Sequence, residues 1–206
     1  MVKKLIGILP TLGIILFSAL YFYSSTFYPG GCQADLNSSG FDWINNYWCN
    51  LMNVQGMNGL ENPARPFAIM AMLVLCLSLM LFFVQFAQKL ITTALWRYVV
   101  QFSGIISMLF AIFIFTEYHD LMTVLSSLFG AIVVIGMIFA MYRSDMTFYK
   151  VVGIMCLLLL AVNNYIYYSK QLIEHLPLIQ KITFAVVLLW IIGLNNKIIR
   201  LDERIQ

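Results

Sequence analysis

The sequence has little charge. Only 10% of its 206 residues are Asp, Glu, Lys or Arg, while 62% are hydrophobic, and the mean hydropathy is +0.87. Soluble globular domains carry about 25% charged residues, so this composition excludes an ordinary soluble protein and indicates an integral membrane protein. The net charge of +3 reflects the membrane topology predicted below from the basic residues. We therefore expect no nucleic-acid partner.

Residues that carry several common chemistries are also scarce. The chain has two histidines, His119 and His175, so a zinc site with three histidine ligands is excluded. It has neither a CxxC pair nor a phosphate-binding glycine loop, which argues against thiol exchange and ATP binding. No ionisable residue lies deep inside a long apolar run, as it would in a proton-coupled transporter. We therefore expect no cofactor.

Long apolar runs dominate what is present. Six of them reach the ~20 residues needed to cross a bilayer, and helices are expected because a bilayer core holds no water to satisfy backbone groups. The sequence predicts an all-α, polytopic six-transmembrane-helix bundle forming a single domain over 1–206, with helices at about 5–23, 66–88, 98–116, 121–142, 151–169 and 178–195. The first run could also open a secretory signal, but no clean cleavage site follows it, so an uncleaved helix is expected.

Basic residues indicate the orientation. Three of them, Arg65, Lys170 and Lys181, lie on one side of the predicted membrane. The other side carries nine: Lys3, Lys4, Lys89, Arg97, Arg143, Lys150, Lys197, Arg200 and Arg204. Because Lys and Arg are retained on the cytoplasmic side, we predict a multi-pass protein of the plasma (inner) membrane, with both termini cytoplasmic.

The segment 24–64 is then a long outer loop. It holds two of the four cysteines, three acids and no Lys or Arg, and such a polar insert is where recognition or chemistry is expected. Cys32 and Cys49 would lie in an oxidising compartment, so we predict a disulfide between them, which would stabilise the fold by ~3 kcal/mol. Two free thiols are the alternative.

Aromatic and amide side chains follow in the same loop. The stretch 41–48 predicts a short helix at the headgroup level. It either anchors the loop or forms a platform for a ligand, with Trp43, Asn46 and Asn50 as binding residues.

A calcium loop is a second interpretation of part of this segment. Asp35, Asn37 and Ser39, followed by Gly40, match the opening of an EF-hand loop, but Asn46 stands where the bidentate Glu is required. An ordinary polar turn is the alternative.

Several short motifs of the loop occur in a fixed order. They are Tyr28-Pro29-Gly30-Gly31, Gly40-Phe41-x-Trp43, Asn46-Tyr47-Trp48-Cys49-Asn50-Leu51, Asn58-Gly59 and Asn62-Pro63. In these motifs the chain resembles an uncharacterised family of six-helix bacterial integral membrane proteins related to the Frag/DRAM-type group, in which the position of Asn50 is often Asp. The resemblance implies six helices and a plasma-membrane location, and it lends no activity.

A second candidate site is the short turn before the fourth predicted helix. Glu117, His119 and Asp120 lie there, and a histidine oriented by a carboxylate can act as a general base. In the alternative interpretation Asp120 caps the helix and His119 is a solvated interface residue.

Other polar residues are predicted at a similar depth. Asn163 and Asn164 lie in the fifth helix, and Arg65 opens the second, where it would bind a lipid phosphate or anchor the helix among headgroups. Together with the turn they would line an outward-facing polar site under the loop.

Three functions fit these features. We expect binding of a membrane lipid or a protein partner, with a homo-oligomer among the partners considered. The alternative is an outer-leaflet lipid-modifying enzyme that uses His119 and Asp120, and the third is a channel or transporter for a small neutral or polar solute.

Overall fold

The computed structural model describes residues 2–142 and 146–205, with side chains described for 5–142 and 146–201. Within this part the regular elements are all helical, and pairing between extended segments is limited to two isolated bridges. The long helices are α1 (Val2–Ser25), α2 (Arg65–Leu90), α3 (Ala94–Ile112), α4 (His119–Tyr142), α5 (Thr147–Ser169) and α6 (Leu176–Ile205). Three short 3₁₀ turns are η1 (Trp48–Met52), η2 (Phe113–Phe115) and η3 (Ile173–His175).

All six long helices are long and apolar enough to cross a membrane, so the prediction of six helices is confirmed. Their ends differ from the predicted ones. α1 begins at Val2, and α6 continues to Ile205, past the predicted end at residue 195. The prediction followed the apolar runs, whereas the helical backbone continues through the polar residues that flank them.

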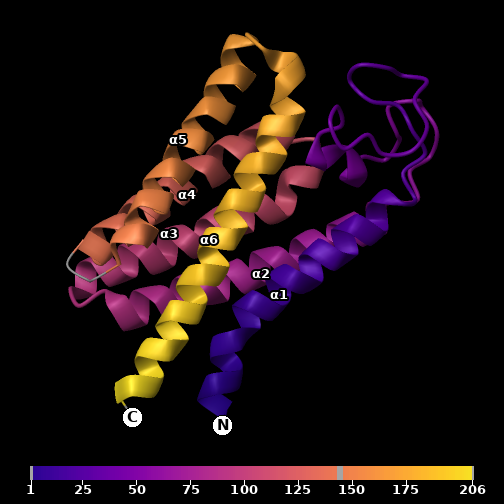
Figure 1. Cartoon of the computed structure of the whole chain (residues 1–206). Coiled ribbons are helices and arrows are strands. Elements are labelled where there is room, and N and C mark those ends of the chain that lie inside the picture. The colour runs from indigo at the N-terminus through magenta and orange to yellow at the C-terminus, as the bar shows by residue number, and fades with distance from the viewer. Residues whose placement is uncertain (1, 143–145, 206) are drawn as a thin grey trace.

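The helices form a bundle whose two ends differ (Figure 1). Both termini lie at one end, which we call the terminal end. The segment 26–64 lies at the other end and is called the cap. Successive helices pack side by side, α6 returns to contact α1, and α2 contacts α1, α3, α4 and α6. α2 is therefore the central helix, and the cap sits over the ends of helices from both halves of the chain.

Close approach and buried amides hold the helices together. A Cβ added at Gly13 of α1 would lie 2.7 Å from the Cβ of Ser78 in α2, so only glycine fits there. Buried Asn195 of α6 donates to the Gly7 carbonyl (2.9 Å) and the Thr11 hydroxyl (3.0 Å) of α1. Hydrogen bonds of this kind between apolar helices fix their rotation and depth.

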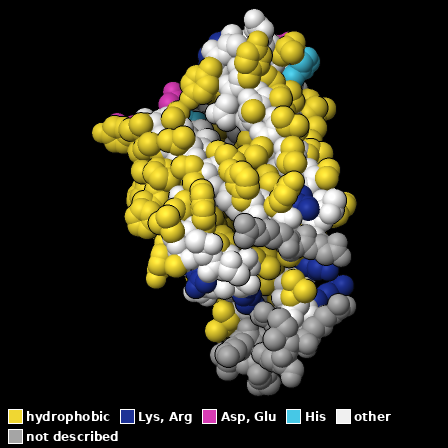
Figure 2. All heavy atoms as spheres, turned by 90° about the vertical axis from the view of Figure 1, so that its left-hand side faces the viewer, with side chains coloured by type: hydrophobic (Ala, Val, Ile, Leu, Met, Phe, Trp, Pro, Cys, Tyr) yellow, Lys and Arg dark blue, Asp and Glu magenta, His cyan; other side chains and the backbone are white. Residues whose placement is uncertain are grey.

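The outside of the bundle is mainly apolar. Figure 2 shows one side as a broad hydrophobic surface, with acidic and histidine side chains toward the cap end and most Lys and Arg side chains toward the terminal end. Large apolar residues such as Phe139 (68% exposed) and Leu189 (67%) contribute to this surface. Such a surface suits hydrocarbon and is unfavourable in water.

Candidate functional site

The cap is docked on the ends of α1 and α6. The Tyr21 hydroxyl donates to the Trp48 carbonyl (2.7 Å), and the two rings pack edge-on with centroids 4.6 Å apart. From α6, the Gln180 side-chain oxygen accepts the Trp48 N–H (3.2 Å), and the Lys181 ammonium donates to the carbonyls of Asn46 and Pro177. These contacts fix η1 over the bundle.

Asparagine side chains hold the cap internally. The buried Asn46 side chain accepts from the Asp42 N–H (2.8 Å) and donates to the Gly31 carbonyl (2.8 Å). Buried Asn62 donates to the carbonyls of Asn50, Leu51 and Asn53, at 2.9 to 3.3 Å. The side-chain oxygen of Asn50, also buried, accepts from Gln33 (3.4 Å). The two predicted ligand-binding amides, Asn46 and Asn50, thus make hydrogen bonds within the cap.

Both glycines of the turn at the start of the cap lie close to other backbone, and a Cβ at Gly30, where φ is +128°, would lie 2.4 Å from the Ser38 carbonyl oxygen. Gly31 has a φ of +80°, and a Cβ there would lie 2.6 Å from the backbone carbon of Met57. The Gly30 carbonyl accepts the Asn58 N–H (3.2 Å), and the Asn58 amide donates to the Pro29 carbonyl (3.0 Å). This explains why two glycines follow Pro29, since a side chain at either position would force apart backbone segments of the cap that lie against each other.

The predicted Cys32–Cys49 disulfide is wrong for this structure, where both residues are free thiols. The Cys32 sulfur accepts the Asp35 N–H (3.3 Å) and lies 3.7 Å from a carboxylate oxygen of Asp42. Burial raises the pKa of Cys49 to about 11, against the opposing effect of Lys181. The amide hydrogen bonds described above close the loop without a covalent link.

The carboxylate beside Cys32 is held in its charged form. Partial burial acts to raise the pKa of Asp42, but hydrogen bonds from the Asn45 side chain and from the backbone N–H groups of Ile44 and Asn45 outweigh it and lower the pKa. The negative charge of Asp42 therefore stabilises the turn that follows it.

The short helix predicted over 41–48 is also displaced. The structure has turns through this stretch and a 3₁₀ helix at Trp48–Met52. Trp43 packs on Phe22 (centroids 4.8 Å apart) and on Phe41 (5.1 Å), and it remains 36% exposed. The aromatic side chains that suggested a helix instead pack the cap against the end of α1.

Two other predicted sites lie within the cap or at its edge. Arg65 donates from Nε to the Met52 carbonyl (3.1 Å), so its side chain ties α2 to η1. Asp35 and Asn37 are exposed and share a turn in which the Asp35 carboxylate accepts the Asn37 N–H (2.9 Å). Ser39, the third predicted calcium ligand, pairs through its backbone with Gly30. No group of three His, Cys, Asp or Glu side chains suited to a metal occurs among the residues described.

The turn before α4 forms a compact hydrogen-bonded group that we call the carboxylate relay: His119, Asp120 and Tyr167. One carboxylate oxygen of Asp120 lies 3.1 Å from His119 Nδ1 and accepts the Tyr167 hydroxyl of α5 at 2.7 Å. The adjacent side chains of His119 and Asp120, which sequence spacing leaves free to diverge, therefore meet. The Asp120 side chain is 77% exposed, and Glu117, three positions earlier in the chain, is also exposed. The relay is open to the surface.

Polar side chains continue from the relay into the bundle. Asn163 of α5 donates to the Thr183 hydroxyl of α6 (2.6 Å), and Asn164 donates to the Leu160 carbonyl (2.8 Å). Within the described side chains, three buried polar atoms lack a hydrogen-bond partner: Trp48 Nε1, Thr123 Oγ1 and Asn163 Oδ1. Such atoms mark places where water or a polar ligand group is accommodated.

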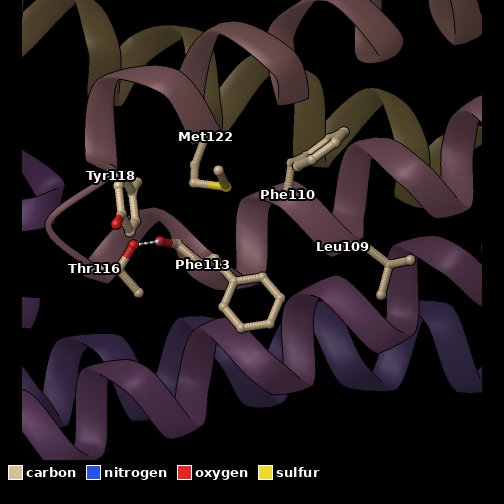
Figure 3. Close-up of a pocket in the computed structure, with 6 residues that line it drawn as sticks. All are labelled: Leu109, Phe110, Phe113, Thr116, Tyr118 and Met122. Carbon is tan, nitrogen blue, oxygen red and sulfur yellow. Dashed lines mark hydrogen bonds between the residues drawn. The ribbon is translucent and has the colours of Figure 1, made fainter.

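An apolar groove begins at the same turn. It has a volume of about 340 Å³ and is lined by Leu109, Phe110, Phe113, Thr116, Tyr118 and Met122. Figure 3 shows these side chains around the connection from α3 through η2 to α4, where the Thr116 hydroxyl donates to the Phe113 carbonyl (2.7 Å). Four of the six lining residues carry wholly apolar side chains, and the Thr116 hydroxyl donates to the backbone, so the groove is mainly apolar.

The cap lies next to this region. η1 contacts η2, and the charge of Asp120 is among the smaller influences that raise the pKa of Cys49. The structure therefore brings His119, Asp120 and the η1 part of the cap to one end of the bundle. Arg65, Asn46 and Asn50 contribute to the cap's own hydrogen bonds.

The sequence did not predict Tyr167, the groove residues or Lys181 as site residues. Tyr167 and the groove residues gave no signal, because a tyrosine near a helix end and an apolar helix face are ordinary features of membrane proteins. Lys181 was recognised as a basic residue on the outer side, but its partner in the cap is far away in sequence.

Comparisons of the chain with protein-family models, curated proteins and solved structures find no match.

Proposed function

We propose that the chain is a multi-pass membrane protein that binds a membrane lipid at its cap end. The lipid headgroup would contact the carboxylate relay, and an acyl chain would lie along the groove. The observation that carries the proposal is this apolar groove, whose lining includes Thr116 and Tyr118 of the turn that also holds the exposed Asp120 carboxylate. A ligand with a polar head and an apolar tail matches that change in character.

The charges favour a zwitterionic phospholipid with an amine in its headgroup. Asp120 and Glu117 present carboxylates that attract a cation, and one Asp120 oxygen is already fixed by Tyr167 and His119. The Lys170 ammonium lies 4.3 Å from the centre of the Tyr167 ring. Tyr167 is also the residue whose hydroxyl contacts Asp120. A phosphate would contact Lys170 while the amine contacts the carboxylates.

Lipid binding can be measured with the full chain in detergent. Titration with phosphatidylethanolamine, followed by native mass spectrometry, gives the bound fraction. Leu109→Trp fills the groove and should weaken binding by roughly tenfold or more, the change that corresponds to ~1.4 kcal/mol. Tyr167→Phe should weaken it less, because it removes a single hydrogen bond to Asp120.

Tyr165→Phe is the matched control. It removes an exposed hydroxyl that donates to Gln171 (3.2 Å), from a residue two positions before Tyr167 in α5, and it should leave lipid binding unchanged. Equal lipid binding by the wild type, Leu109→Trp and Tyr167→Phe would contradict the proposal.

An outer-leaflet lipid-modifying enzyme is the second candidate. It is favoured by the contact between His119 and Asp120, since a carboxylate on Nδ1 leaves Nε2 of the ring to act as a base. His119→Ala separates the two functions. If the protein is an enzyme, the wild type converts bound phosphatidylethanolamine to a new lipid species and this variant does not, even at lipid concentrations that saturate its binding. If the protein only binds lipid, neither the wild type nor the variant changes the lipid.

A further inference from the structure

A second hollow lies at the opposite end of the bundle. It has a volume of about 580 Å³ and is enclosed by the end of α2, the connection 91–93, the start of α3 and the last turns of α4. Its lining includes Ile91, Thr92, Thr93, Trp96, Phe139 and Tyr142. This volume falls within the range of about 300 to 1,000 Å³ that is typical of small-molecule sites.

The lining divides into two kinds of surface. Thr92 and Thr93 bring hydroxyl groups in the connection between α2 and α3. Trp96 and Phe139 add large apolar side chains that are 52% and 68% exposed. The hollow therefore offers hydrogen-bonding groups together with a wall that suits hydrocarbon.

Two basic side chains are held beside it. Arg97 donates from Nε to the Ile91 carbonyl (3.0 Å) and from Nη2 to the Thr92 carbonyl (3.2 Å), both in residues that line the hollow. The Lys150 ammonium of α5 lies 5.3 Å from the ring centre of Tyr142, another lining residue. Among the described residues that line the hollow, none is an acid. The local charge thus favours an anion.

We propose that this hollow binds an anionic phospholipid of the leaflet at the terminal end. Arg97 and Lys150 attract the phosphate, the threonine hydroxyls donate to its oxygens, and an acyl chain packs on Trp96 and Phe139. A free phosphate would leave the apolar wall uncovered, so a lipid is the better occupant. The inference is independent of the proposed function, which concerns the other end of the bundle.

Fluorescence quenching provides the test, because Trp96 lies in the site. The full chain is reconstituted in phosphatidylcholine vesicles that contain equal fractions of brominated phosphatidylglycerol or brominated phosphatidylcholine. Trp96→Phe, compared with the wild type, separates the Trp96 signal from that of Trp43, Trp48 and Trp190. We expect brominated phosphatidylglycerol to quench Trp96 more strongly. Lys150→Gln should reduce this preference about fivefold, the change expected for the loss of one basic group.

Two further variants define the controls. Lys170→Gln removes the same charge from the cap end and should leave the preference intact. Ala140→Phe keeps every charge but fills the hollow, of which Ala140 is a lining residue, and should abolish the preference. Equal quenching of Trp96 by the two brominated lipids would overturn the proposal. So would a preference that persists in both Lys150→Gln and Ala140→Phe, since it would then come from diffuse surface charge.

Discussion

Buried asparagines show why single residues were hard to assign from sequence. The same amide that could bind a ligand can also satisfy other groups of the cap: Asn46 and Asn62 bond backbone carbonyls, and Asn50 accepts from the Gln33 side chain. The choice depends on burial and on carbonyls that folding brings together, neither of which is visible in a short motif. His119 and Asp120 were assigned more easily, because adjacent ionisable residues in an oily chain stand out. Their partner Tyr167 is 47 positions from Asp120.

The thiol of Cys49 allows a pH prediction at this scale. Because burial raises the pKa of Cys49 to about 11, the native protein at pH 8 should hold on the order of a hundredfold less Cys49 thiolate than an unfolded chain. Iodoacetamide, read by peptide mass spectrometry, should modify Cys49 rapidly in SDS and very slowly in mild detergent. An exposed thiol introduced as Asn37→Cys supplies the reference rate in both conditions.

The same shift has a consequence for stability. The unfolded chain loses the Cys49 proton near pH 8.5, before the folded chain does, so the contribution of this thiol to stability is complete below that pH. It decreases as the pH rises toward about 11. Rapid modification of Cys49 in the native protein, or a Cys32–Cys49 linked peptide in an unreduced sample, would contradict this account.

At the scale of elements, long apolar runs were sufficient to predict six helices, because the bilayer leaves little choice of backbone structure. The cap was harder. Its 3₁₀ helix at Trp48–Met52 is positioned by Tyr21, Gln180 and Arg65, which belong to three different helices. Local propensity therefore gave the wrong position for it, since tertiary contacts decide where so short an element forms.

The contact between α1 and α2 can be tested with two glycines of one helix. Gly13→Ala places a Cβ 2.7 Å from that of Ser78, whereas the Cβ of Gly7→Ala would meet Ile199 at an ordinary 3.4 Å. We expect Gly13→Ala to reduce the free energy of unfolding by about 1–3 kcal/mol through overpacking. Gly7→Ala should be neutral or slightly stabilising, because alanine favours helix.

Thermal unfolding in detergent, followed by circular dichroism, compares the two variants. The double variant Gly13→Ala with Ser78→Gly removes the clash and should recover most of the loss. A Gly13→Ala protein as stable as Gly7→Ala would show that α1 and α2 do not approach as closely as described.

At the scale of the whole molecule, the distribution of charge predicts the orientation, with the cap outside and the terminal end in the cytoplasm. A membrane-impermeant maleimide should therefore label Asn37→Cys in intact cells. It should label Thr92→Cys, at the exposed connection between α2 and α3, only after the membrane is permeabilised. The native cysteines, buried or partly buried, provide a low background. Labelling of Thr92→Cys in intact cells would reverse the assignment.

The dependence of the cap on α6 also sets an order of assembly during synthesis. Trp48 meets Gln180 across 132 positions, and Asn46 meets Lys181 across 135. The cap leaves the ribosome long before α6, so it cannot make these contacts until α6 has been synthesised and has packed against the bundle. A chain shortened before α6 would lack Gln180 and Lys181, the two α6 side chains that hold η1, so its cap should be cleaved by an added protease faster than the cap of the full chain.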